Sequence, residues 1–171
     1  MIALNKKILI FSIVAFILFM STTSTAEALI KEFEGKKLRA YLDSAGIPTI
    51  GYGSIFNPDL NRPVKLGDQI DDATALRWLR SEINAKETAI KRMITVPVTR
   101  KQLDALTSLA YNIGTGAFHR STLLRYLNSN KPKITVANQF LVWNKVTKNG
   151  VKVVEPGLSR RRALERALFL S

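Results

Sequence analysis

The sequence contains no cysteine and a single histidine, His119, in 171 residues. The chain therefore forms no disulfide and no thiolate metal site, although an exported domain with a good core can do without disulfides. Acidic residues are also scarce, because 13 Asp and Glu stand against 26 Lys and Arg, giving a formal net charge of +13. Such a surface favours an anionic partner: nucleic acid, anionic lipid or an acidic cell-wall polymer. Charge alone does not choose among them.

Length and hydrophobicity favour one compact domain. Hydrophobic residues make up 46% of the chain, which is enough for a real core. Asp68, Asp71 and Asp72 do not follow the spacing of a calcium loop, so we interpret them as helix-start residues. We expect no metal site and no cofactor. His119 has no partner pattern around it and is expected at or near the surface.

The first residues have the form of an export signal. Lys6 and Lys7 precede the uncharged run 8–20, and small residues suited to cleavage follow, ending in Ala26 or Ala28. This order of basic, apolar and small segments is typical of a secretory signal. The uncharged stretch also approaches the ~20 residues that span a bilayer, so an uncleaved anchor stays an alternative. A buried helix of the domain is less consistent with the run, which has no polar stripe.

The chain is accordingly divided into residues 1–28, an export signal or signal-anchor, and residues 29–171, the folded domain. The hydrophobic pattern and the Gly, Pro and capping residues predict a series of elements. They are a helix over 27–34, strands over 38–42 and 48–52 joined by a turn at 43–46, a loop-rich region over 54–69, and helices over 71–94, 99–113, 121–127, 135–143 and 159–170. One hairpin followed by a helical bundle is an α+β arrangement.

Two carboxylates near the start of this domain occupy different surroundings. Glu34 ends a helix beside the apolar Phe33, and burial there disfavours its charged form. Asp43 begins a polar turn, where it should stay ionised. A protonated and an ionised carboxyl are the basic equipment of glycoside hydrolysis, and the Thr49 hydroxyl can hold a water against Asp43. Glutamates at helix ends and aspartates at turns are common, so spacing alone does not show that they share a cleft.

Several stretches together resemble one family. Glu34, eight residues, Asp43, five residues, Thr49 and then "IGYG" is similar to the catalytic region of the phage-type lysozymes, glycoside hydrolase family 24. "LTSLAYNIGTGAF" and "STLLRYLN" resemble the central helix of that family and the helix after it. "PGLSRRRALERALFL" resembles the C-terminal basic helix of the P22-like phage endolysins. The resemblance covers residues 29–171, essentially the whole predicted domain.

The resemblance implies a mostly helical lysozyme-like fold with a small β-hairpin region next to the active-site cleft. It implies Glu34 as the general acid, Asp43 as the second catalytic carboxylate and Thr49 as the residue that helps to hold the attacking water. The bond cleaved would be the β-1,4 bond between N-acetylmuramic acid and N-acetylglucosamine in peptidoglycan, with inversion. Tyr111 and Ser121 fall where family members contact the glycan.

Two features of the sequence bear on this site. Many family members carry a histidine directly after the glycine-rich strand, where this chain has Ser54. We expect the change to alter local ion pairing rather than catalysis. Arg160, Arg161 and Arg162 are consecutive on the last predicted helix, so helical geometry places at least one in solvent while another can approach Glu34. An arginine there favours the charged form of Glu34 and opposes burial, which leaves the net direction open.

The leading hypothesis is thus an endolysin or muramidase, a monomer exported to the periplasm or cell wall. Its partners would be peptidoglycan and the anionic wall surface, with the inner membrane added if the N-terminal segment is retained. A second hypothesis is a non-catalytic cationic module that binds the wall or disrupts membranes. A third, nucleic-acid binding, has only the net charge in its favour, because the basic residues are spread over many helices and no nucleic-acid motif is present.

Overall fold

The computed structural model describes residues 24–171 apart from residues 44 and 149. The predicted export segment up to residue 23, and Ser44 of the predicted turn, lie outside the described residues. The helices are α2 (Thr25–Glu34), α3 (Asp72–Lys91), α4 (Arg100–Ile113), α5 (Thr115–His119), α6 (Thr122–Asn128), α7 (Lys133–Asn138) and α8 (Pro156–Leu170). The strands are β1 (Lys37–Leu42), β2 (Pro48–Gly51), β3 (Phe56–Asn57), β4 (Arg62–Pro63), β5 (Lys145–Lys148) and β6 (Val151–Val154). They form antiparallel pairs β1–β2, β3–β4 and β5–β6, which confirms the α+β class.

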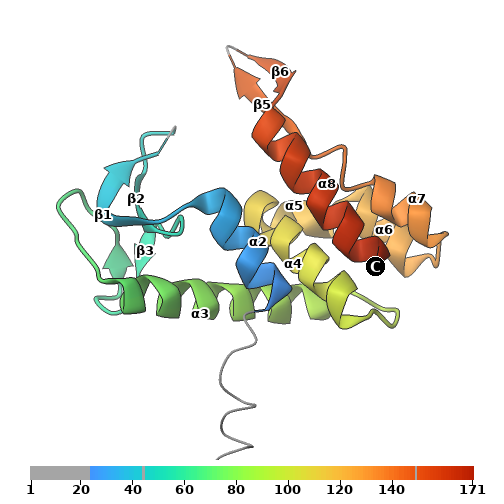
Figure 1. Ribbon diagram of the computed structural model, residues 1–171, viewed down its shortest axis with the longest axis horizontal. Helices are drawn as coiled ribbons and strands as arrows, with labels where there is room; N and C mark the ends of the chain where they lie inside the picture. The colour runs from blue at the N-terminus through green and yellow to red at the C-terminus, as the bar shows by residue number, and fades with distance from the viewer. Residues whose placement is uncertain (1–23, 44, 149) are drawn as a thin grey trace, which may run out of the picture.

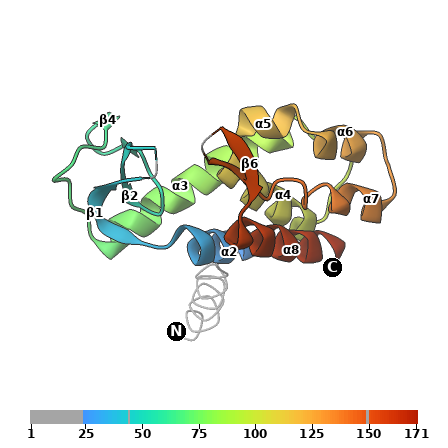
Figure 2. The same ribbon diagram turned by 90° about the horizontal axis from the view of Figure 1, so that it is seen from above.

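The elements separate into two regions joined by one long helix. The strands β1–β4 gather at one end and the helices α4–α8 at the other, while α3 runs along both (Figures 1 and 2). Helix α2 lies between the two regions and contacts α3, α4 and α8. No helix within the part of the chain that the structure describes is both long and apolar enough to cross a membrane.

Local sequence signals fix the ends of the main helices. Ser24 caps α2 by accepting from the N–H of Glu27 at 3.1 Å, and Asp71 caps α3 by accepting from Thr74 N–H at 2.7 Å. Thr99 and Gln102 form a reciprocal capping box at the start of α4, as their spacing predicts. Each cap satisfies backbone donors that the first turn of a helix cannot.

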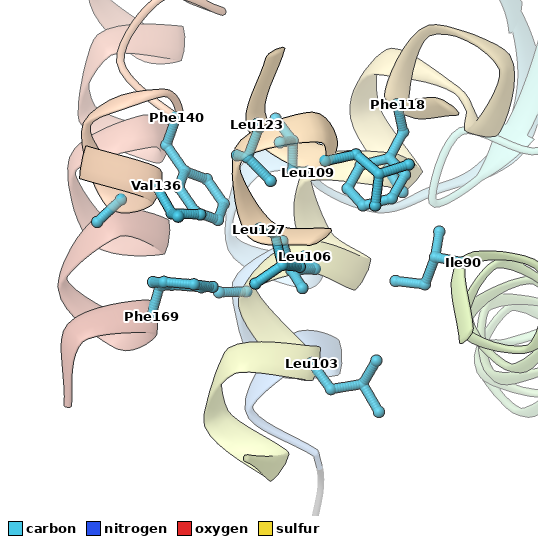
Figure 3. Packing of buried hydrophobic residues seen from close by; sticks show 14 residues of the cluster. Ile90, Leu103, Leu106, Leu109, Phe118, Leu123, Leu127, Val136, Phe140 and Phe169 are labelled. Atoms are coloured by element: carbon cyan, nitrogen blue, oxygen red, sulfur yellow. The ribbon is translucent and has the colours of Figure 1, made fainter. Parts of the chain in front are cut away.

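The main core belongs to the helical region. Leucine and phenylalanine side chains from α4 to α8 meet around Leu106 and Leu109 (Figure 3). The rings of Phe140 and Phe169 lie 5.6 Å apart at a tilt of 53°, a favourable arrangement for an aromatic pair. A second cluster, Ile30, Tyr52, Ala75, Leu79 and Ile83, joins α2 and the end of the first hairpin to α3. The helix that carries Glu34 is therefore held from both regions.

The structure corrects the sequence prediction in the C-terminal third. The helix predicted over 135–143 is wrong in its extent, because α7 spans Lys133–Asn138. Residues 145–154 form the unpredicted hairpin β5–β6, in which Lys145 pairs with Val154 and Lys148 with Val151. Alternating valines around Asn149-Gly150 are a hairpin signal that the helical spacing of the neighbouring segments obscured. Short pairs β3–β4 also occur in the predicted loop region, and α5 was not predicted.

Candidate active site

The first helix and the first hairpin deliver the two predicted carboxylates. Glu34 is the last residue of α2, and Gly35 ends that helix at φ 66°. Asp43 directly follows β1, whose Leu42 pairs with Pro48 of β2. Because Tyr41 is the partner of Thr49, Asp43 and Thr49 lie close to the same turn. Glu34 thus ends α2, while Asp43 and Thr49 lie at or next to the turn that joins β1 to β2.

Glu34 is held by a buried arginine from the last helix. Its Oε1 accepts from Nη1 of Arg161 at 2.7 Å. The Arg161 side chain is 2% exposed and that of Glu34 is 23% exposed, so the cation lies inside and the carboxyl reaches the surface. The guanidinium also stacks over the ring of Phe33, 5.6 Å from its centre. Arg161 is therefore the arginine that approaches Glu34, a question that the sequence left open.

The other two arginines of the run take different positions. Arg160 is exposed and pairs with Glu32 at 2.5 Å. Arg162 is buried and lies 3.1 Å from Glu165 and 3.1 Å from the side-chain oxygen of Asn112. The prediction that at least one arginine faces solvent is confirmed.

Gly53 lies against the other oxygen of Glu34. A Cβ at this position would lie 3.7 Å from Glu34 Oε2, and the backbone φ is +99°. Both the conformation and the close approach therefore favour glycine. Because residue 53 is glycine, no side chain from this position covers Oε2 of Glu34.

Asp43 organises the turn that it begins. Its Oδ1 accepts from the backbone N–H groups of Ala45 at 2.8 Å and Ile47 at 2.9 Å. These two bonds hold one oxygen of the carboxylate in a fixed position at the start of the turn. Asp43 thus begins a turn, as expected from the sequence, and it is half-buried there.

Thr49 is more enclosed than a surface threonine. It is 3% exposed, and its hydroxyl donates to the carbonyl oxygen of Ile47 at 3.0 Å. That bond uses the only proton of the hydroxyl, so the hydroxyl oxygen can only accept any further hydrogen bond. A water that Thr49 holds would consequently donate to it.

A hollow of about 500 Å³ lies beside this site, with walls from the chain after β2, from α3 and from the end of α4. Its lining includes Gly53, Ser54, Glu82 and Tyr111. The Tyr111 hydroxyl donates to Glu82 at 2.9 Å and lies 3.1 Å from the carbonyl of Tyr52. Burial, together with the neighbouring Glu82, raises the pKa of Tyr111, so the phenol stays protonated. Tyr111 is thus both a structural link and a wall of the hollow.

Ser54, at which the family resemblance led us to expect altered ion pairing, hydrogen-bonds to Glu82. Its hydroxyl donates to Glu82 Oε1 at 2.5 Å. A neutral donor therefore faces the Glu82 carboxylate. The expected change in local ion pairing at this position stays a prediction.

Ser121 directly precedes α6 and His119 ends α5, and both are far from Glu34 and Asp43 in the sequence. Ser121 is 6% exposed, and its hydroxyl caps α6 by accepting from Leu124 N–H at 3.1 Å. His119 is exposed at the end of α5. Among residues 24–171, with the two gaps noted, no cluster of His, Asp or Glu could hold a metal ion.

Sequence reasoning missed the groups behind Arg161. Glu165 is fully buried and lies 3.2 Å from Arg161 Nε. A second hollow, of about 670 Å³, lies where the hairpin β5–β6 meets α4 and α8, with Trp143, Asn112 and Leu158 in its lining. The signal for Glu165 was available, because it is four residues after Arg161 and so lies on the same helix face. The hollow depends on the unpredicted hairpin.

Comparison with known proteins shows the family of the chain. The family model described as Phage lysozyme matches residues 31–165. An endolysin of Acyrthosiphon pisum secondary endosymbiont phage 1 is 41% identical over 143 residues, covering 84% of this chain and 93% of the relative. The endolysin of Salmonella phage P22 is 41% identical over 152 residues, covering 89% and 99%.

A solved structure shows the same fold. The endolysin from Escherichia coli O157:H7 phage FAHEc1 superposes with a TM-score of 0.80 at 40% identity, covering 89% of this chain and 94% of that one. The family match spans most of the chain, and the relatives are 41% identical over most of its length. The chain belongs to the phage lysozyme family, and it is a peptidoglycan-degrading glycosidase of the endolysin type.

Proposed function

We propose that the protein hydrolyses the β-1,4 bond between N-acetylmuramic acid and N-acetylglucosamine, with Glu34 as general acid and Asp43 as the second carboxylate. The observation that carries this assignment is the contact between Glu34 and the buried Arg161. It fixes one oxygen of a partly exposed carboxyl and leaves the other near Gly53, which lines the neighbouring hollow. Such fixed orientation is what proton donation to a glycosidic oxygen requires.

Asp43 and Thr49 act on the water in this proposal. The turn amides hold Oδ1 of Asp43, and we assign the other oxygen to the water. Thr49 accepts a hydrogen bond from the same water, because its own proton goes to Ile47. Activation of a water on the face of the sugar opposite the acid leads to inversion of the anomeric carbon.

The hollow beside Gly53 is proposed to receive the sugar chain. Tyr111 forms part of its wall, and an aromatic ring offers an apolar face to a sugar. Ser121 contributes indirectly in this proposal, since its hydroxyl is used to cap α6. The net charge of +13 attracts the anionic wall, and salt should weaken that attraction.

Delivery to the wall is assigned to the N-terminal segment. The basic and apolar pattern of residues 6–20 supports export to the periplasm or cell wall. If the segment is retained, it also tethers the enzyme to the inner membrane. We propose that the exported enzyme acts as a monomer and binds no nucleic acid.

The test compares the chain from Ser24 onward with its Glu34→Gln variant on purified peptidoglycan, with released sugars identified by mass. Glu32→Gln is the matched control, because Glu32 is on the same helix and its partner Arg160 is exposed. The wild type and the control should release fragments ending in reducing N-acetylmuramic acid, while Glu34→Gln loses about 10³-fold or more of the rate.

Three results would change the assignment. Anhydro-muramic ends would mean a transglycosylase and remove the water from Asp43 and Thr49. Wall binding by both proteins without sugar release would favour the non-catalytic module. A β-anomer as the first product, seen by NMR during the reaction, would contradict inversion, which predicts the α-anomer.

A further inference from the structure

Arg161, Arg162 and Glu165 form a buried charge cluster. The chemistry proposed for Glu34, Asp43 and Thr49 gives no role to Arg162 or Glu165. Arg161 makes three contacts from three sides of its guanidinium: Nη1 to Glu34 at 2.7 Å, Nε to Glu165 at 3.2 Å and Nη2 to the carbonyl of Ser108 at 3.2 Å. Because the guanidinium is planar and rigid, these contacts from α2, α8 and α4 leave it one orientation. Glu165 therefore shares a single cation with the proposed acid.

Glu165 contacts Arg161, Ser108 and Arg162. The carboxylate has no exposed surface, and its Oε1 also accepts from the Ser108 hydroxyl at 2.7 Å. Its Oε2 lies 3.1 Å from Nε of Arg162, which makes a close ion pair. Neither of these two atoms has a hydrogen-bond partner among the described residues. Because a buried charge without its partner is costly, Glu165 and the two arginines beside it depend on one another.

The charges of Arg161, Arg162 and Glu165 set the net positive charge close to the Glu34 carboxyl. Burial lowers the pKa of Arg162 only to about 10, so Arg162 is cationic at neutral pH. Burial raises the pKa of Glu165, and Arg162, Ser108 and Arg161 oppose that rise. With Glu165 ionised, the charge of Arg162 is cancelled and Glu34 faces the net charge of Arg161 alone. With Glu165 neutral, Glu34 would face two positive charges.

We propose that Glu165 is a positioning residue for the reaction, which orients Arg161 toward Glu34 and offsets the positive charge of Arg162 near that carboxyl. This inference rests on the proposed role of Glu34 as general acid. Glu165 does not touch the sugar and acts only through Arg161 and the local field.

Other charged or titratable groups around Glu34 define the background of the test. They are Lys31 and Glu32 on α2, Tyr111 on α4, Glu82 on α3, and Arg160, Arg161 and Arg162 on α8. The variants below leave Glu34, Arg161 and the groups outside α8 unchanged. Differences among these variants therefore report on the cluster.

The experiment compares pH–rate profiles of kcat/KM on purified peptidoglycan for Glu165→Gln, Arg162→Met and the double variant. The alkaline limb belongs to the group that must carry a proton. Removing the negative charge in Glu165→Gln should move that limb to lower pH by about one unit. Arg162→Met should move it to higher pH. The double variant, which again presents Arg161 alone, should return to within about 0.3 unit of the wild type.

Controls separate this role from simple packing. Arg166→Met removes a positive charge from the same helix, where Arg166 bonds to Asn138 instead, and should leave the limb in place. A uniform loss of rate without a shift in Glu165→Gln, or no return in the double variant, would overturn the proposal. If Glu165→Gln does not fold, Arg162→Met and the double variant still carry the test, because their limbs should differ.

A readout without catalysis distinguishes the two proposals. NMR titration of the ¹³C-labelled Glu34 carboxyl should move in the same direction as the alkaline limb in each variant. If the wild type releases no sugar, the muramidase assignment fails, while the titration still tests Glu165. If sugar is released and the Glu34 titration is the same in all variants, only the role of Glu165 fails.

Discussion

Arg161 donates to Glu34 from inside the protein, with an Nη1–Oε1 distance of 2.7 Å. Their elements lie at opposite ends of the chain, and only the packing of α2 against α8 brings them together. One end of the sequence thus supplies the proposed acid and the other supplies the group that orients it. Contacts of this kind make the site sensitive to the shape of the cation as well as to its charge.

Replacing Arg161 by lysine should therefore impair catalysis although the charge stays. A lysine ammonium cannot contact Glu34, Glu165 and the Ser108 carbonyl at once, so Glu34 loses its fixed orientation. We expect kcat to fall by about 10- to 100-fold with little change in KM. Steady-state kinetics on soluble glycan fragments would measure both constants.

Arg160→Lys is the matched control for this change. Arg160 is the preceding residue, and its exposed pair with Glu32 contributes little. Kinetics within twofold of the wild type are expected. A KM increase without a kcat change in Arg161→Lys would mean that Arg161 binds substrate rather than orienting the acid.

Gly53→Ala should harm activity more than its effect on stability explains. The positive φ of Gly53 makes alanine strained, at about 1–3 kcal/mol, and the new methyl would lie beside Glu34 Oε2. Gly67→Ala offers a control, because Gly67 has a similar φ of +97° with nothing near its added Cβ. Both variants should have lower melting temperatures than the wild type. At a temperature where both are folded, only Gly53→Ala should lose about tenfold in kcat/KM. Equal activity of the two folded variants would show that the space beside Glu34 is not used.

The first hairpin and the long helices were predictable from local sequence because their signals lie within a few residues. The Thr99–Gln102 capping box and the glycine that ends α2 act on their own helices. Asp43 could be assigned to a turn for the same reason. The structure confirms these elements to within a few residues, except that α3 ends at Lys91 and leaves Ile94 outside.

The contacts among distant elements could not be predicted in this way. Sequence indicated that an arginine of α8 could approach Glu34, but helix rotation decides which one, and that depends on packing with α4 and α2. Glu165 and Asn112 gain their roles only from that packing. The hairpin β5–β6 was missed because its two strands contribute little to the buried core.

Acid should weaken the loop between β4 and α3 through Asp68. The Arg62 guanidinium, and then the Lys65 N–H, hold the pKa of Asp68 down at about 2. A carboxyl whose folded pKa is depressed stabilises the fold above its unfolded value of about 3.9, and that contribution is lost as pH falls toward 2. Asp68→Asn should therefore lower the melting temperature at pH 6, with the difference from wild type closing between about pH 4 and pH 2.

Arg62→Gln completes that comparison. Because Arg62 is the main partner, it should reproduce most of the Asp68→Asn effect, and the double variant should be less destabilised than the sum. Melting curves by circular dichroism at several pH values would measure this. A difference that persists unchanged at pH 2 would contradict the role of the Asp68 charge.

The start of α2 bears on what an active domain must contain. Both predicted cleavage positions, after Ala26 and after Ala28, lie inside α2, which begins at Thr25 and uses Ser24 as its cap. Ala26 is fully buried, and Glu27 pairs with Arg80 at 3.0 Å. A chain beginning at Glu27 would lose the cap and a buried residue from the helix that carries Glu34.

We expect the chain beginning at Glu27 to melt several degrees below one beginning at Ser24. Ser24→Ala isolates the cap and should lower stability by about 0.5–2 kcal/mol, while Ser81→Ala on the exposed side of α3 should change it little. Differential scanning calorimetry measures the shift, and peptidoglycan hydrolysis at 25 °C and 40 °C shows whether activity is lost with it. Equal melting temperatures for the two chain starts would mean that α2 is held by Ile30 and its neighbours alone, and that cleavage at either alanine leaves the site intact.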